Sequence, residues 1–250
     1  MSRRPLYLFA GDSLTEGTYG ESYVARIAAA LERGEAGLTG QAVNAGRGAD
    51  TIKSLLNRID APLRRRRPEW VILAIGCNDV WIPWLTAHSV IWRMWALVRR
   101  IQFGQVPTTD LDQFAALYRA LIDKAEREAD ARVLACTTSG CGEQLSSPPN
   151  RQIARLNGVI KGVAADCGAP VADVWQAFVD ELAPLPKPSA YIAGELLFTM
   201  LDRRRLQTTS PDAISQRRRL HLTFDGLHLN SRGADLWAQT ILAALAQAQQ

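Results

Sequence analysis

Three polar residues in this chain have the types that nucleophilic catalysis requires. Ser13 follows an apolar run near the N-terminus, and a serine hydroxyl needs one group to take its proton and another to orient that base. Of the three histidines, His228 is the best placed, because Asp225 stands three residues before it, across Gly226. A turn could bring that carboxylate to one ring nitrogen while the other nitrogen faces the serine. We therefore predict a triad of Ser13, His228 and Asp225.

Apolar runs alternate with amphipathic stretches along the chain, and these must position the polar residues. We predict strands at 6–9, 42–45, 70–75, 132–136 and 170–174. We predict helices at 21–32, 51–59, 111–129, 151–166 and 232–246. This alternation predicts a parallel sheet, and right-handed crossovers make it a three-layer α/β/α sandwich. Because such folds keep their chemistry at the carboxyl ends of the strands, Ser13 and Asn78 should meet at one edge.

Three short segments resemble the SGNH or GDSL hydrolases. They are GDSL at 11–14, GCND at 76–79 and DGLHLN at 225–230, and the match spans the whole chain. The resemblance implies a flavodoxin-like SGNH hydrolase fold in a single domain, 1–250. It also implies a serine esterase of the GDSL type that works without a cofactor.

The resemblance further implies three hydrogen-bond donors for the oxyanion of the reaction. They are the backbone N–H of Ser13, the side-chain amide of Asn78 and one backbone N–H from the segment 44–51. In that segment Ala49 stands where the family has a glycine. If the position is an ordinary helix N-terminus, Ala49 serves equally well, and this is our expectation. If it requires a left-handed backbone, Gly48 should be the donor, because alanine does not adopt a positive φ freely.

Each segment alone also fits a simple turn, so the prediction depends on their joint occurrence. The order Ser, Asp, His is shared with the α/β-hydrolases, which carry their serine in Gly-x-Ser-x-Gly. Around Ser13 the second glycine is replaced by Thr15. Around Ser139, another serine at a strand end, both glycines are replaced, by Thr137 and Cys141. Neither serine therefore stands in the Gly-x-Ser-x-Gly motif of the α/β-hydrolases.

Length and composition are those of one globular α/β domain: 250 residues, 47% hydrophobic, with a net charge of +4. Arginine clusters lie at 64–67, 203–205 and 217–219. They lie apart and accompany no nucleic-acid motif, so we interpret them as solvated helix ends and loops and predict no nucleic-acid partner. The four cysteines do not have zinc-like spacing, so we predict free thiols and no metal. The N-terminus passes directly into the first strand without a separate signal, which predicts a cytoplasmic protein.

Two segments, 80–107 and 178–223, exceed what the sandwich requires, and both adjoin catalytic segments. We expect cap-like insertions that shape the pocket. The first carries four tryptophans, whose large rigid rings could form an apolar wall that binds an acyl or aryl group. They are Trp81, Trp84, Trp92 and Trp95. The alternative is that tryptophans at helical spacing pack in their own domain. Arginines interrupt the run before it could span a membrane, whereas a helix lying on a membrane surface stays possible.

The predicted reaction is acyl transfer in two steps, from a small-molecule ester through Ser13 to water. We expect an esterase for short or medium acyl or aryl esters. An acyltransferase or a carbohydrate deacetylase would use the same triad, so both stay open. A binding module without catalysis ranks last, because every proposed catalytic side chain is present. The sequence does not indicate an oligomeric state.

Overall fold

The computed structural model describes residues 4–192 and 196–250, with the side chains of all of these except 196–200. Its centre is a parallel sheet of five strands in the order β2-β1-β3-β4-β5. The strands are β1 (Leu6–Gly11), β2 (Gln41–Asn44), β3 (Trp70–Ala74), β4 (Arg132–Cys136) and β5 (Val171–Ala172). Each coincides with a predicted strand. The edge strand β5 is shorter than expected, because only Val171 and Ala172 pair with β4.

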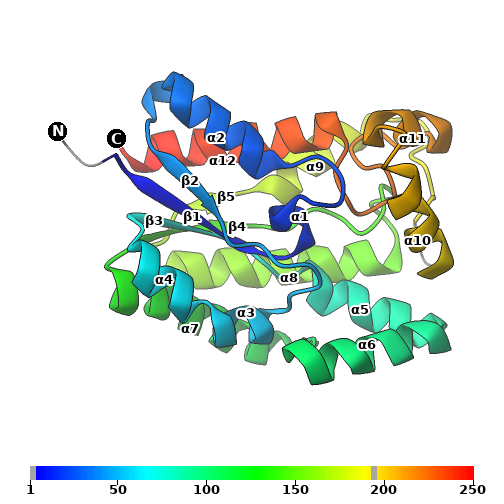
Figure 1. The fold of residues 1–250 in the computed structure, drawn as a ribbon, viewed down its shortest axis with the longest axis horizontal. Coiled ribbons are helices and arrows are strands. Elements are labelled where there is room, and N and C mark those ends of the chain that lie inside the picture. The colour runs from blue at the N-terminus through cyan, green and yellow to red at the C-terminus, as the bar shows by residue number, and fades with distance from the viewer. Residues whose placement is uncertain (1–3, 193–195) are drawn as a thin grey trace.

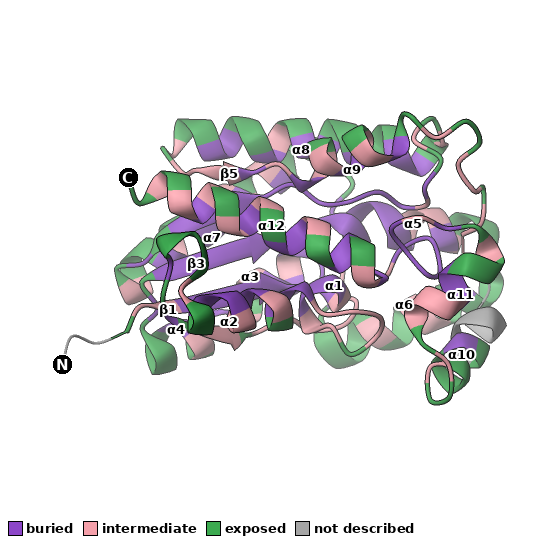
Figure 2. Ribbon diagram, turned by 90° about the horizontal axis from the view of Figure 1, so that it is seen from above, coloured by how far each residue is buried: buried purple, intermediate pink, exposed green. Residues whose placement is uncertain are grey.

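Helices cover both faces of the sheet, so the predicted α/β/α sandwich is confirmed (Figure 1). One face carries α2 (Tyr23–Arg33), α9 (Val174–Leu182) and α12 (Ser231–Ala248). The other carries α3 (Ile52–Arg58), α4 (Asp60–Arg66), α7 (Leu111–Ala129) and α8 (Pro148–Asp166). Alternate residues of β1 supply the two cores, with Leu8 facing one and Tyr7 the other. The strands are therefore buried on both faces, as Figure 2 shows for β1 and β3.

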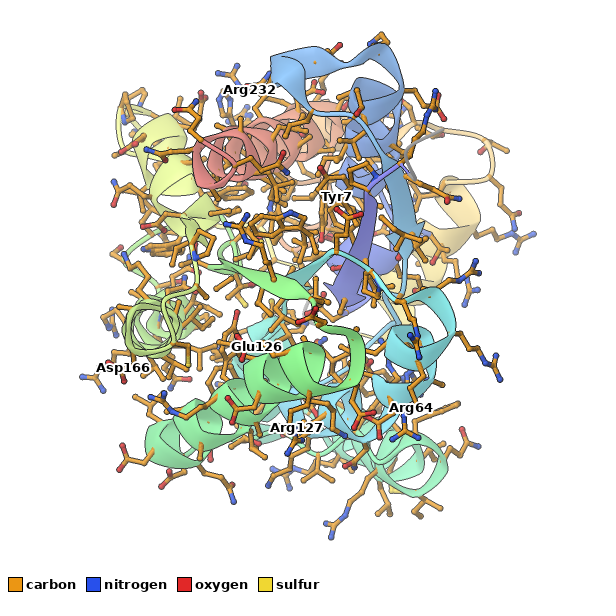
Figure 3. The ribbon with its side chains drawn as sticks, turned by 90° about the vertical axis from the view of Figure 1, so that its left-hand side faces the viewer. Tyr7, Arg64, Glu126, Arg127, Asp166 and Arg232 are labelled. Atoms are coloured by element: carbon orange, nitrogen blue, oxygen red, sulfur yellow. The ribbon has the colours of Figure 1, made fainter. Side chains whose placement is uncertain are left out.

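Polar side chains surround this core. Figure 3 looks at the end of the sheet where the strands begin, and Tyr7 lies inside, between the sheet and α12. Its hydroxyl accepts a hydrogen bond from Gln249 of the C-terminus at 3.0 Å. Arg64 lies on α4 and pairs with Glu128 of α7 at 2.8 Å, as expected for a solvated arginine cluster. Sequence periodicity did not predict α4 itself, because its second half consists of arginines.

Further helices gather at the opposite end, toward which the strands point (Figure 1). They are α1 (Ser13–Glu16), α5 (Cys77–His88), α6 (Val90–Phe103), α10 (Leu196–Arg205) and α11 (Pro211–Arg218). The predicted insertion 80–107 corresponds to most of α5, all of α6 and the loop after it. The predicted insertion 178–223 begins too early, because Phe178 belongs to α9 and is buried in the core below it. Its remainder contains α10 and α11.

The strand order reverses between β1 and β3. From β1 the chain goes to β2 on one side, and then crosses back to β3, β4 and β5 on the other. Ligands of open α/β folds bind at such a switch point, outside the carboxyl ends of the two strands. Ser13 follows β1 and Asn78 follows β3, so the fold brings both to this crevice. Over the described residues, no helix is long and apolar enough to cross a membrane.

Candidate active site

Ser13, His228 and Asp225 form a continuous hydrogen-bonded relay. The hydroxyl oxygen of Ser13 lies 3.0 Å from Nε2 of His228. On the other side of the ring, Nδ1 lies 2.7 Å from Oδ2 of Asp225. The Asp225 side chain is only 3% exposed, whereas that of His228 is 13% exposed and reaches the cavity described below. Ser13 lies more than two hundred positions from the other two residues in the sequence, and the sandwich brings it to them.

The loop before α12 holds Asp225 and His228 rigidly. Oδ1 of Asp225 accepts hydrogen bonds from the backbone N–H groups of Leu227, at 2.8 Å, and His228, at 2.7 Å. Gly226 between them has φ 89°, and a Cβ there would lie 2.8 Å from the carbonyl oxygen of Tyr191. This position therefore requires glycine. The ring of Tyr19 packs edge-on against His228, with 4.5 Å between ring centroids.

The electrostatics of this loop favour an ionised aspartate. Burial by itself would raise the pKa of Asp225, but the neighbouring His228 charge and the hydrogen bonds from His228 and Leu227 outweigh it and lower the pKa below its usual value. Asp225 therefore stays a carboxylate at neutral pH. Its Oδ2 can accept a hydrogen bond from the Nδ1–H of His228 and support the positive charge that His228 acquires when it takes a proton through Nε2.

A tight turn after β1 presents Ser13. A Cβ on Gly11 would lie 2.3 Å from the carbonyl oxygen of Ala74 in β3, so only glycine fits there. Asp12 caps α1 by accepting the N–H of Leu14 at 3.0 Å. Burial raises the pKa of Asp12 to about 7. The neighbour of the serine is therefore a buried carboxyl that holds its proton to a higher pH than a free aspartate does.

The segment that was expected to supply the second oxyanion donor is a turn and not a helix start. The N–H of Asp50 bonds the carbonyl of Arg47 at 3.1 Å, and α3 begins only at Ile52. Ala49, the third residue of this turn, has φ 62°. The premise that Ala49 stands at an ordinary helix N-terminus is therefore wrong, because the turn imposes the left-handed conformation on an alanine. Gly48 is not among the residues with positive φ.

Asn78 has one of its two amide hydrogens engaged. Its Nδ2 donates to the carbonyl oxygen of Asp50 at 3.0 Å, in buried surroundings. The contact joins the end of β3 to the turn 47–50, and the second N–H of the amide is left for another acceptor. Ser13, Gly48, Ala49 and Asn78 all line one cavity.

A network of ion pairs and hydrogen bonds that the sequence did not indicate holds the turn 47–50 in place. Asp50 is fully buried and pairs with Arg47 at 2.7 Å and with Arg58 of α3 at 2.5 Å. The carbonyl oxygen of Gly48 accepts from Arg99 of α6 at 2.7 Å and from the buried Gln105 at 2.9 Å. Arg99 and Gln105 are more than fifty positions from Gly48 in the sequence, so no local spacing could have revealed these two contacts.

The cavity beside the triad has a volume of about 430 Å³. Asn78, Trp81, Ile82 and Leu85 line it from one face of α5, at the i, i+3, i+4 and i+7 spacing of a single helix face. The same spacing in the sequence could have selected these residues. Trp84 lies off this face, stacks on Trp81 with 5.0 Å between centroids and lines a second cavity beside His88. The predicted set of four tryptophans is therefore not brought together at the triad.

Two of the predicted tryptophans on α6 do reach this cavity. Trp92 is buried and packs in the core, and its ring meets that of Trp95 edge-on with 5.2 Å between centroids. Trp95 is half-buried and lies beside Arg99. On the polar side the lining includes Glu16, Thr18 and, from α10, Arg203. Core packing and pocket lining are thus not alternatives for Trp81 and Trp92, which do both.

The chain is similar in sequence and in fold to known hydrolases. The sequence matches the GDSL-like lipase/acylhydrolase family over residues 9–236. It is 25% identical over 194 residues to an acetylxylan esterase of Geobacillus stearothermophilus, covering 71% of this chain and 80% of that protein. The crystal structure of the acetylxylan esterase Axe2 from the same organism superposes with a TM-score of 0.63 at 20% identity, over 97% of this chain and 94% of Axe2. LAE5, an alpha/beta hydrolase enzyme from the metagenome of Lake Arreo, gives 0.66 at 19% identity, over 100% and 98% of the two chains.

The fold is that of the SGNH hydrolases, as the sequence predicted. The match over residues 9–236 covers most of the chain, which belongs to the GDSL-like lipase/acylhydrolase family. The protein is thus a serine ester hydrolase of the GDSL type.

Proposed function

We propose that this enzyme hydrolyses carboxylic esters of short or medium acyl or aryl acids, with Ser13 as nucleophile, His228 as general base and Asp225 as the group that orients the base. The observation that carries the proposal is the relay from Ser13 through His228 to Asp225, at 3.0 and 2.7 Å, beside a cavity of about 430 Å³. Such a relay activates a hydroxyl that is otherwise a poor nucleophile at neutral pH.

The reaction takes two steps. Nε2 of His228 takes the hydroxyl proton as the Ser13 oxygen attacks the ester carbonyl carbon, and the carbonyl oxygen becomes an oxyanion. When the tetrahedral intermediate collapses, His228 gives the proton to the departing alcohol and an acyl-serine is left. A water molecule, deprotonated by His228, then attacks the acyl group and releases the acid, and Ser13 regains its proton.

The oxyanion donors in this proposal are the backbone N–H groups of Ser13 and Ala49 and the second amide N–H of Asn78. In a trans peptide the C=O and the following N–H point in opposite directions. Arg99 and Gln105 both donate to the Gly48 carbonyl oxygen, so the N–H of Ala49 in the same peptide points away from these two side chains and is left for the oxyanion, which supports Ala49 over Gly48 as the donor. Each such donor is typically worth roughly 3 to 4 kcal/mol in the transition state.

The lining of the cavity supports an apolar acid part of the substrate. Trp81, Ile82, Leu85 and Trp92 make one wall, and a volume of about 430 Å³ suits a small molecule. Trp81 and Trp92 are each only 6% exposed. Rings so deeply set form a wall and leave little open face for a sugar to stack on.

An acetylated carbohydrate is the second candidate substrate. It is supported by the similarity to an acetylxylan esterase and by the polar side of the cavity, where Glu16, Thr18 and Arg203 could bind hydroxyl groups. The acetyl group would then occupy the tryptophan wall and the sugar would lie toward these polar residues.

Hydrolysis of p-nitrophenyl esters of increasing acyl length, together with acetate release from acetylated xylo-oligosaccharides, tests both candidates. We expect Ser13→Ala to abolish turnover, Asn78→Ala to lower kcat roughly 10²- to 10³-fold, and Ser146→Ala, on an exposed serine, to leave it unchanged. A preference for acetylated sugars over every simple ester would favour the second candidate. Turnover that survives in Ser13→Ala would refute the mechanism for both.

A further inference from the structure

The outward face of α6 is an exposed apolar stripe. Six large apolar side chains on this helix are between 46% and 76% exposed. At the helical repeat they fall on one side of α6, which we call the α6 stripe. Its members are Val90, Ile91, Met94, Leu97, Val98 and Ile101. Contiguous apolar surface of this kind on a folded domain marks a site of interaction.

The opposite face fixes α6 to the domain. Trp92 is buried in the core, and Arg99 donates a hydrogen bond to the carbonyl oxygen of Gly48 at 2.7 Å. The stripe therefore belongs to a helix that is packed in place, and its side chains point outward because the inner positions are already filled.

The charges on α6 are all positive. The helix carries Arg93, Arg99 and Arg100 and contains no aspartate or glutamate. Arg93 and Arg100 are exposed and stand seven residues apart, two helical turns, so they follow one edge of the α6 stripe. An apolar face with arginines along its edge and no acidic residue is the pattern of helices that lie in the headgroup region of anionic membranes.

We propose that the α6 stripe docks this enzyme on an anionic lipid surface. The apolar side chains enter the region between headgroups and acyl chains, and Arg93 and Arg100 meet lipid phosphates at its edge. With 14 residues, α6 is about 21 Å long and shorter than the roughly 30 Å of a hydrocarbon core, so it lies along the surface. This docking does not depend on the proposed substrate.

A lipid surface fits the α6 stripe better than a second copy of the chain does. Two α6 stripes packed face to face would bring the arginines of both helices to one interface without an acidic residue of α6 to neutralise them, and like charges at an interface oppose association. The inner face of α6 also lines the cavity through Trp92, Trp95 and Arg99. Docking would therefore hold the active-site end of the molecule (Figure 1) close to the membrane.

Flotation of the full chain with lipid vesicles tests this proposal without using catalysis. The vesicles are equal parts phosphatidylcholine and phosphatidylglycerol, compared with phosphatidylcholine alone. We expect wild type to float with the anionic vesicles and to be released by high salt. The double variant Leu97→Glu/Ile101→Glu should lose binding more than tenfold, and Arg93→Gln and Arg100→Gln should each weaken it about fivefold.

Matched controls change the same residue types elsewhere on the surface. Leu111→Glu alters an exposed leucine at the start of α7, and Arg65→Gln/Arg127→Gln removes two exposed arginines on other helices. All should float as wild type does, and circular dichroism with thermal unfolding checks that every variant is folded. The proposal would be overturned if wild type did not float with the anionic vesicles, or if the α6 variants floated as wild type does. A dimer in sedimentation velocity that Ile101→Glu dissociates would also overturn it, since the stripe would then join two copies of the chain.

Discussion

The loop 225–228 and helix α6 border the same cavity, yet they are held in place in opposite ways. In the loop the polar atoms of the two side chains have partners: both oxygens of Asp225 accept hydrogen bonds, and both ring nitrogens of His228 contact a neighbour. On α6 the inner side chains include Trp92, which is buried, and Arg99, which bonds the turn 47–50, whereas the outer side chains are exposed and mainly apolar. The side chains of the loop thus find their partners within the domain, whereas α6 contacts the domain through one face only.

This difference predicts where each region is sensitive to change. A site whose groups act as one unit loses most of its function when any member is removed. A helix anchored on one face responds strongly to changes there and weakly to changes on the other. Substitutions in the two regions should therefore separate catalysis from stability.

The largest effect is expected in the loop, from Asp225→Asn. Asparagine can still accept the N–H groups of Leu227 and His228, but it holds His228 in the wrong tautomer and cannot support its charge. We expect kcat to fall about 10⁴-fold, measured on the best ester substrate. Asp235→Asn, which changes an exposed aspartate paired with Arg26, is the control and should keep full activity. A loss of less than tenfold in Asp225→Asn would mean that the relay is not the catalytic unit.

Within α6, substitutions on the two faces should differ in their effect on stability. Trp92→Ala removes a side chain that is 6% exposed and should lower the free energy of unfolding by about 3 to 5 kcal/mol. Met94→Ala, on a residue that is 60% exposed, should change it by less than about 0.5 kcal/mol. Urea unfolding of both variants measures the contrast. Equal effects would show that α6 is not anchored through its inner face.

The buried carboxyl of Asp12, beside Ser13, should make stability depend on pH. Because burial raises the pKa of Asp12 to about 7, from 3.8 for the free side chain, the folded protein keeps a proton that the unfolded chain releases. The contribution of Asp12 is therefore unfavourable above about pH 4 and grows until about pH 7, to as much as about 4 kcal/mol. Asp12→Asn should be more stable than wild type at pH 7 and lose that advantage near pH 4. Urea unfolding at both pH values checks this, and an advantage that does not vary with pH would contradict it.

A smaller effect on catalysis is expected from a substitution on the inner face of α6. Arg99→Met removes one of the two side chains that hold the Gly48 carbonyl while Gln105 still holds it. The turn 47–50 should become less well positioned, and we expect kcat to fall about tenfold with KM nearly unchanged, in line with the loss of one charged hydrogen bond. Arg93→Met, on the outside of the same helix, should leave both constants unchanged for a soluble ester. A rise in KM alone would make Arg99 a substrate contact instead.

The fold was predictable where local sequence decides it. The helix α7 and the strand β4 have the predicted bounds, because amphipathic spacing after the capping Asp110 and a continuous apolar run are local signals. The contact of Ser13 with His228 and Asp225 was predictable because Asp225 and His228 are close in sequence and Ser13 directly follows a strand. Their assembly required only that the strands be parallel.

The parts that could not be predicted depend on distant contacts. The left-handed backbone of Ala49 belongs to a turn whose Gly48 carbonyl is held by Arg99 and Gln105, and neither of these two contacts has a local signature. Trp84 has the same residue type as Trp81 but lies on another face of α5, toward a different cavity. Residue type suggested an aromatic wall, and only the helix geometry selects which rings form it.

Covalent labelling tests the central claim most directly. A fluorophosphonate reacts with an activated serine, and mass spectrometry of the digested protein locates the adduct. The relay at 3.0 and 2.7 Å predicts one adduct, on Ser13, and no adduct in His228→Ala, which lacks the base. Labelling of another serine, or labelling of Ser13 that persists without His228, would contradict the account.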